Sequence, residues 1–134
     1  MTRKAQTSLP FAAIYATVAM LLVIGVAYGS QVYAADFMRK NLVDIQADRA
    51  ANAALALKSM PAGHIELKLK SYEFKWNDAA NNVTIAYEGT IGTQHIDSDY
   101  FKDITGPTTL QKVENKICLK KTDEDKLKFS MGEC

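Results

Sequence analysis

The sequence predicts an α+β protein with a long N-terminal helix, membrane-spanning in its first half, followed by a small antiparallel β-sheet domain of about four strands. Three observations predict this fold. Residues 10–28 are almost continuously apolar, and apolar residues then recur at helical spacing as far as residue 57. After residue 63 apolar and polar residues alternate, which is typical of strands. We therefore divide the chain into a basic leader (1–5), a long helix (6–60, transmembrane part 10–30) and an extracytoplasmic β domain (61–134).

The apolar stretch is long enough to cross a membrane. No charged residue occurs between Lys4 and Asp36. About twenty residues, rising ~1.5 Å each in a helix, span the ~30 Å hydrocarbon core of a bilayer. The buried helix of a soluble domain would usually keep a polar face, which this run lacks. Because positive residues flanking such a segment stay in the cytoplasm, Arg3 and Lys4 place the N-terminus inside and the β domain outside.

A short pattern stands directly before the apolar stretch. It comprises Arg3, Lys4, Gln6, Ser8 and Pro10. A basic leader followed by this pattern and an apolar helix resembles the class III signal peptide of archaeal type IV pilin-like proteins. The resemblance covers about the first thirty residues. It implies that a prepilin peptidase cuts between Ala5 and Gln6, and that the apolar segment remains as membrane anchor and later as filament core.

The chain departs from the family pattern at one position. Many members carry Glu where this chain has Pro10, and that carboxylate pairs with a neighbouring N-terminal amine during assembly. Proline cannot form this pair, which favours an alternative in which the chain is a tethered extracellular binding or accessory domain that does not polymerise. Two other interpretations of the segment are an uncut signal anchor and a secretory signal peptide cut after Ala34 or Ala35.

The helix is expected to continue out of the membrane. Neither Gly nor Pro occurs from Asp36 to Met60, and the apolar positions recur at alternating four- and three-residue spacing. These positions are Val43, Ala47, Ala50, Ala54 and Leu57. We expect one helix from about Leu9 to Lys58. Its apolar face is expected to pack on the chain's own β domain or on other subunits.

The remainder of the chain carries strand patterns. Alternation predicts strands over residues 64–70, 72–76, 83–87, 113–119 and 127–131, with turns at 77–81 and 122–125. The apolar phase flips at Ser71, which indicates a β-bulge or a bend. The strands on either side of turn 77–81 are expected to form a hairpin. Aromatic residues Tyr72, Phe74 and Trp76 are expected in the core.

Two covalent features are predicted. Cys118 and Cys134, beyond a membrane segment, suggest a disulfide formed in an oxidising, extracytoplasmic space. It would close a loop of about 17 residues, worth ~3 kcal/mol in the chain-entropy model. Asn82-Val83-Thr84 is an N-glycosylation acceptor pattern at the start of a strand.

Catalytic signals are few. The formal net charge is +1, which gives no nucleic-acid signature, and there is no zinc, redox or phosphate-binding motif. The cluster His95, Asp97, Asp99 and Asp103 offers nitrogen and oxygen ligands, but turn-forming residues suit a solvated loop better. We expect no enzyme, no metal and no cofactor; an anchored enzyme using residues 95–99 is the least favoured hypothesis.

The resemblance therefore implies a structural subunit or minor component of an archaeal type IV pilus-like surface filament. Its partners would be membrane lipid, the prepilin peptidase and other pilin-like subunits, in homo- or hetero-oligomers. Its location would be the cell membrane, single-pass, with the N-terminus cytoplasmic and the β domain extracellular.

Overall fold

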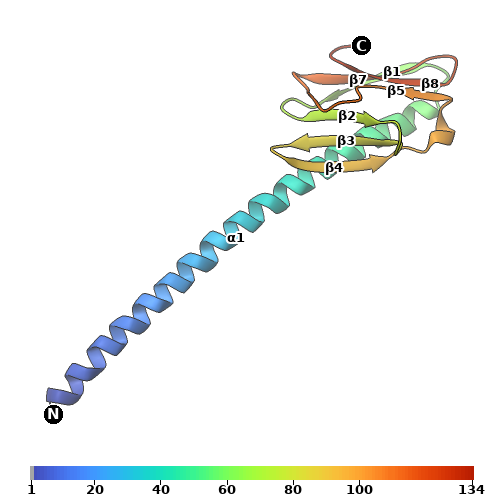
Figure 1. The fold of residues 1–134 in the computed structure, drawn as a ribbon. Coiled ribbons are helices and arrows are strands. Elements are labelled where there is room, and N and C mark those ends of the chain that lie inside the picture. The colour runs from blue at the N-terminus through green and yellow to red at the C-terminus, as the bar shows by residue number, and fades with distance from the viewer. Residues whose placement is uncertain (1) are drawn as a thin grey trace. The chain divides into compact units, whose positions relative to one another are not determined.

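The computed structural model describes residues 2–134, with side chains from Pro10 onward. The elements, in chain order, are α1 (Thr2–Lys58), β1 (Gly63–Lys68), β2 (Glu73–Asn77), β3 (Asn82–Tyr87), β4 (Thr90–His95), the 3-10 helix η1 (Ser98–Tyr100), β5 (Asp103–Thr105), β6 (Gln111–Lys112), β7 (Lys116–Lys121) and β8 (Lys126–Met131) (Figure 1). The predicted α+β class is confirmed. The chain forms two compact units, Met1–Phe37 and Met38–Cys134.

Helix α1 ends at Lys58, as expected, but begins at Thr2 rather than near Leu9. Pro10 consequently lies inside the helix and not in its first turn. The sequence before Pro10 contains no glycine and no other proline, so no residue there favours an end to the helix.

The apolar face at the C-terminal end of α1 belongs to the core of the second unit. Its five predicted positions, Val43, Ala47, Ala50, Ala54 and Leu57, are all fully buried. Four of them, from Ala47 onward, join one apolar cluster with side chains from both sheets. Of the two packing arrangements that the sequence left open, this face therefore packs on the chain's own β domain.

The strands form two four-stranded sheets. Sheet A has the order β1-β7-β8-β5, and sheet B has the order β4-β3-β2-β6. All pairs are antiparallel except β5 with β8. The hairpin of β2 and β3 is confirmed. The described residues form eight strands where about four were expected. The three strands with no predicted counterpart, β4, β5 and β6, lack a clear alternating pattern.

A bend at Ser71 moves the chain from one sheet to the other. Ser71 has a positive φ of 73°, and it separates β1 in sheet A from β2 in sheet B. The inner faces of the sheets then meet through aromatic rings. Phe129 of β8 lies 5.2 Å from Phe74 and 5.6 Å from Trp76, measured between ring centroids. The expectation that Phe74 and Trp76 are core residues is confirmed, whereas Tyr72 is only partly buried and packs against the core.

A buried lysine forms hydrogen bonds with backbone carbonyl groups at the C-terminal end of α1. Lys121 is only 4% exposed, and its Nζ donates to the carbonyl oxygens of Lys58 at 3.0 Å and Met60 at 2.5 Å. The Asp125 carboxylate lies 3.3 Å from the same nitrogen. The last carbonyls of a helix have no partner within it and carry partial negative charge, so a cation here is favourable. This contact joins the end of α1 to the end of β7.

Glycine at position 92 allows β4 to approach α1 closely. A Cβ atom there would lie 2.8 Å from the backbone carbon and oxygen of Val43, both of which are fixed in the helix.

We predict that Gly92→Ala lowers the free energy of unfolding by about 1–3 kcal/mol, because strand and helix must separate. Thermal unfolding of the full chain in a non-ionic detergent measures this. The matched control is Gly63→Ala, whose Cβ would meet only side chains, at 3.4 Å and beyond; equal losses in both variants would contradict the account.

Candidate functional site

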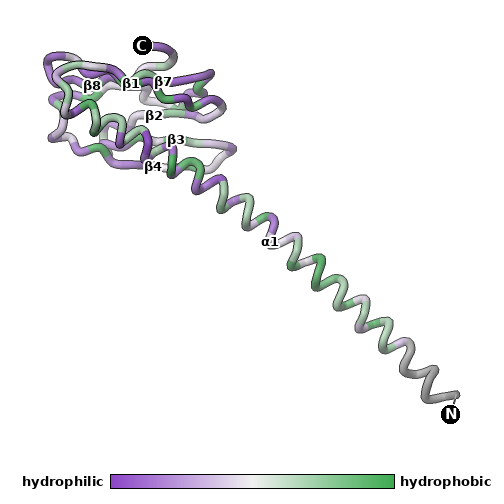
Figure 2. Tube along the Cα trace, turned by 180° about the vertical axis from the view of Figure 1, so that it is seen from behind, coloured by the Kyte–Doolittle hydropathy of each residue, from purple (hydrophilic) through white to green (hydrophobic). Residues whose placement is uncertain are grey.

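The first candidate site is the apolar segment of α1 in the unit Met1–Phe37. From Pro10 to Tyr28 nearly every side chain is exposed, and the described part of the segment is mostly green in the hydropathy view (Figure 2). By length and composition, α1 contains the one candidate membrane span among the described residues, and none of its 18-residue apolar window is buried. Large apolar side chains that stay exposed in a single chain require lipid or other apolar surfaces. The structure is thus consistent with a single-pass membrane protein.

The signal motif falls largely outside what the structure describes. The side chains of Arg3, Lys4, Ala5, Gln6 and Ser8 lie outside the described residues. Pro10 is described, exposed and helical. Cleavage between Ala5 and Gln6 therefore stays a prediction.

The outward side of α1 in the second unit also carries apolar side chains. Met38, Leu42 and Ile45 are 64%, 43% and 54% exposed. Their spacing of four and three residues places them on one face of the helix, away from the buried Val43 and Ala47. We call Met38, Leu42 and Ile45 the outer helix stripe.

The predicted disulfide between Cys118 and Cys134 is present. Their Cα atoms are 5.3 Å apart, and Cys118 is buried in the middle of β7. After β8 the chain turns back at Gly132, which has a positive φ of 91° and donates its N–H to the Lys116 carbonyl at 2.8 Å. The tail, residues 132–134, is therefore held against sheet A.

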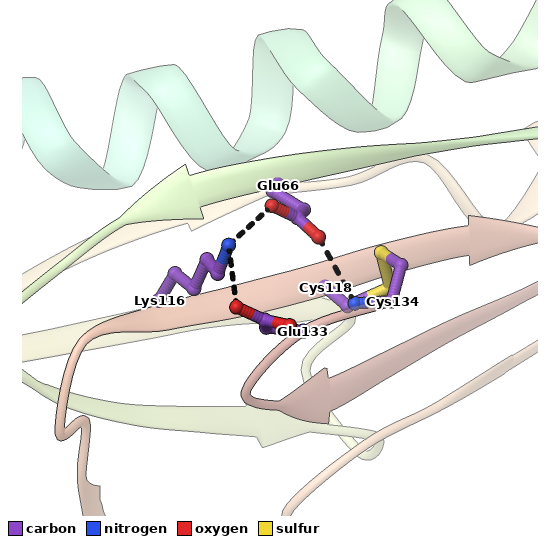
Figure 3. A network of polar contacts seen from close by, with 5 residues as sticks. All are labelled: Glu66, Lys116, Cys118, Glu133 and Cys134. Carbon is purple, nitrogen blue, oxygen red and sulfur yellow. Dashed lines mark hydrogen bonds and ion pairs between the residues drawn. A yellow bond between two sulfur atoms is a disulfide. The ribbon is translucent and has the colours of Figure 1, made fainter.

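Polar contacts connect this tail to the first strand (Figure 3). Glu66 of β1 accepts from Lys116 Nζ at 2.7 Å through one oxygen and from the Cys134 N–H at 3.1 Å through the other. Lys116 Nζ also lies 3.3 Å from Glu133. We call Glu66, Lys116, Glu133 and Cys134 the tail clamp. Glu66, Lys116 and the two tail residues lie far apart in the sequence, and no local pattern indicated that they meet.

The tail clamp shifts the protonation of its members. The hydrogen bond from Lys116, followed by that from the Cys134 N–H, lowers the pKa of Glu66 below its ordinary value. The hydrogen bond to Glu66 likewise raises the pKa of Lys116. A carboxylate whose pKa is lowered on folding stabilises the fold above its unfolded pKa, and this stabilisation is lost as pH falls through the folded pKa.

The other predicted site residues are not assembled into a reactive centre. Asp97 caps η1, and its side chain accepts from the Asp99 N–H at 3.0 Å. Asp97 and His95 line a shallow groove of about 310 Å³ beside Asn52 and Leu55 of α1. Within the described residues, no three His, Cys, Asp or Glu side chains are grouped to hold a metal ion.

The predicted glycosylation acceptor lies at the start of a strand. Asn82 is the first residue of β3 and is half-buried. Its Oδ1 atom is enclosed and has no hydrogen-bond partner among the described residues. Glycosylation of Asn82 stays a prediction.

Comparison of the chain with protein-family models, curated proteins and solved structures finds no match.

We predict that Glu66→Gln lowers the melting temperature near neutral pH and that its difference from the parent chain shrinks as pH falls from about 6 to 3. The parent loses the Glu66 contribution when this carboxylate is protonated, whereas the variant has already lost it. Thermal melts across this pH range provide the measurement.

Glu73→Gln is the matched control, because Glu73 is an exposed strand carboxylate that forms no ion pair among the described residues. A difference between Glu66→Gln and the parent that stays constant over the whole range would contradict the assignment.

Proposed function

We propose that this chain is a structural subunit or minor component of an archaeal type IV pilus-like surface filament. In this proposal a prepilin peptidase removes residues 1–5, the apolar segment holds the chain in the membrane, and helices of several subunits then bundle. The observation that carries the proposal is α1 itself. One helix contains an exposed apolar segment and, further along, a face that is part of the core of a two-sheet domain.

The outer helix stripe supports assembly. Val43, Ala47 and Ala50 are buried in the chain's own core, whereas the apolar side chains of the outer helix stripe, on the other side of the same helix, remain exposed. A second helix laid along Leu42 and Ile45 would bury them at about 25 cal/mol per Å² of apolar surface. Subunits anchored side by side in a membrane would present these stripes to one another.

The proposal is tested by mechanical shearing of cells of the native host. We expect the protein to leave the cells with high-mass filaments. Replacing the stripe residues (Leu42→Gln with Ile45→Gln) is expected to reduce the sheared amount severalfold with the membrane-bound amount unchanged, since the changed side chains are exposed in the single chain. Leu110→Gln, at an exposed site that is 42% accessible in another part of the domain, is the control and should shear normally.

The second candidate is a single-pass, membrane-tethered extracellular binding or accessory domain. Pro10, in place of an acidic residue, favours it, because the assembly contact of the family cannot form at that position. Protein that stays entirely in the membrane fraction after shearing, in the parent chain as well as in the variants, would support this candidate and contradict the filament proposal.

A further inference from the structure

The outer face of sheet A carries a row of basic residues. The strand register places His64 of β1 opposite Lys120 of β7, and Lys120 opposite Lys128 of β8. All three are exposed, while their neighbours along each strand, such as Leu119 and Leu127, are buried in the core. We call His64, Lys120 and Lys128 the basic row. Directly opposed residues on adjacent strands have Cβ atoms about 5 Å apart.

The carboxylates near this face are committed to other lysines. Glu66 and Glu133 pair with Lys116 in the tail clamp, and Glu124 pairs with Lys126 at 2.9 Å. Asp103, at the edge of the sheet, faces Lys126 in the strand register. Within the described part of the chain, Lys120 and Lys128 form no ion pair with a carboxylate. Two lysines of the row thus remain without a carboxylate partner in the described part of the single chain.

The direct opposition of Lys120 and Lys128 opposes folding. Like charges directly opposite each other on adjacent strands destabilise a sheet, and the cost is removed when an anion lies between them. We propose that the basic row binds an anionic polysaccharide through its sulfate or carboxylate groups. The inference concerns the β domain alone and does not require that the chain assembles into filaments.

The composition of the face favours a polysaccharide over other polyanions. Its exposed positions carry no Phe, Tyr or Trp, so His64 is the one ring on which a base of a nucleic acid could stack. They carry no large apolar residue either, so this face has no side chain to insert into a lipid surface. The exposed Thr105, next to Lys128 in the register, adds a hydroxyl group to the row, and the half-exposed Ser130 lies on the same face. These hydroxyls can exchange hydrogen bonds with sugar hydroxyls.

The test measures binding of the full chain, in non-ionic detergent, to immobilised dextran sulfate and to neutral dextran. Measurements are made at about 0.05 M and about 0.15 M NaCl, since screening separates charge-driven binding from other contacts. Lys120→Gln with Lys128→Gln removes the two lysines of the row. Lys75→Gln with Lys112→Gln, in sheet B, removes the same charge elsewhere.

We expect salt-dependent binding to dextran sulfate and none to neutral dextran. The dissociation constant of the row variant for dextran sulfate should be at least about tenfold higher, because each lysine near an anionic surface contributes to the binding free energy. The sheet B variant should bind within about twofold of the parent. A melting temperature that is unchanged in the sheet B variant, and unchanged or higher in the row variant because its opposed charges are gone, shows that the fold is intact.

Three results would overturn the inference. The first is no binding to dextran sulfate at either salt concentration. The second is an equal loss in both double variants, which would indicate only net charge. The third is tighter, row-dependent binding to single-stranded DNA or to anionic phospholipid vesicles than to dextran sulfate, which would assign the row to a different class of polyanion.

Discussion

The packing of the alanine-rich face of α1 against the two sheets is the contact on which the unit Met38–Cys134 depends. Ala47, Ala50 and Ala54 are fully buried, and their small side chains let strands approach the helix backbone. The approach is closest at β4, where only a glycine fits beside Val43. Since a small domain has few other apolar surfaces to bury, residues 43–57 are as much a part of the β domain's core as any strand. A chain that lacked residues 43–57 would lose one wall of its core.

Polar contacts complete this core at its margins. Lys121 satisfies the carbonyl groups at the end of α1, a position where a buried charge is tolerated because three oxygens surround it. On the outer side of sheet A, the disulfide and the tail clamp hold the last residues across β1 and β7. The clamp also uses carboxylates that would otherwise neutralise the face, and this leaves the neighbouring Lys120 and Lys128 available to an external anion.

The sequence predicted those features that repeat locally, and it missed those that depend on distant partners. Helical spacing from Val43 to Leu57 was enough to find the buried face. The alternation of apolar and polar residues located β1, β2, β3, β7 and β8, which have one face toward the core. Strand β4 was missed because Gly92, needed for close approach to the helix, interrupts its apolar pattern. Strands β5 and β6 are three and two residues long, too short for an alternating pattern to be recognised. They are defined by their pairing with β8 and β2. Of the candidate site, the cysteine pair was predictable from composition, whereas the meeting of Glu66 with Lys116, fifty residues away, carried no local signal.

The central claim is that the exposed apolar segment stays covalently joined to the helix face that builds the β domain. The N-terminal sequence of the mature protein, isolated from membranes of its native host, tests this most directly. The account predicts a start at Gln6, as pilin-type processing implies. An intact Met1 would show that the apolar segment is retained and that no peptidase removes residues 1–5. A start at Ala35 or Asp36 would mean that the apolar segment is discarded as a secretory signal, and it would contradict the account.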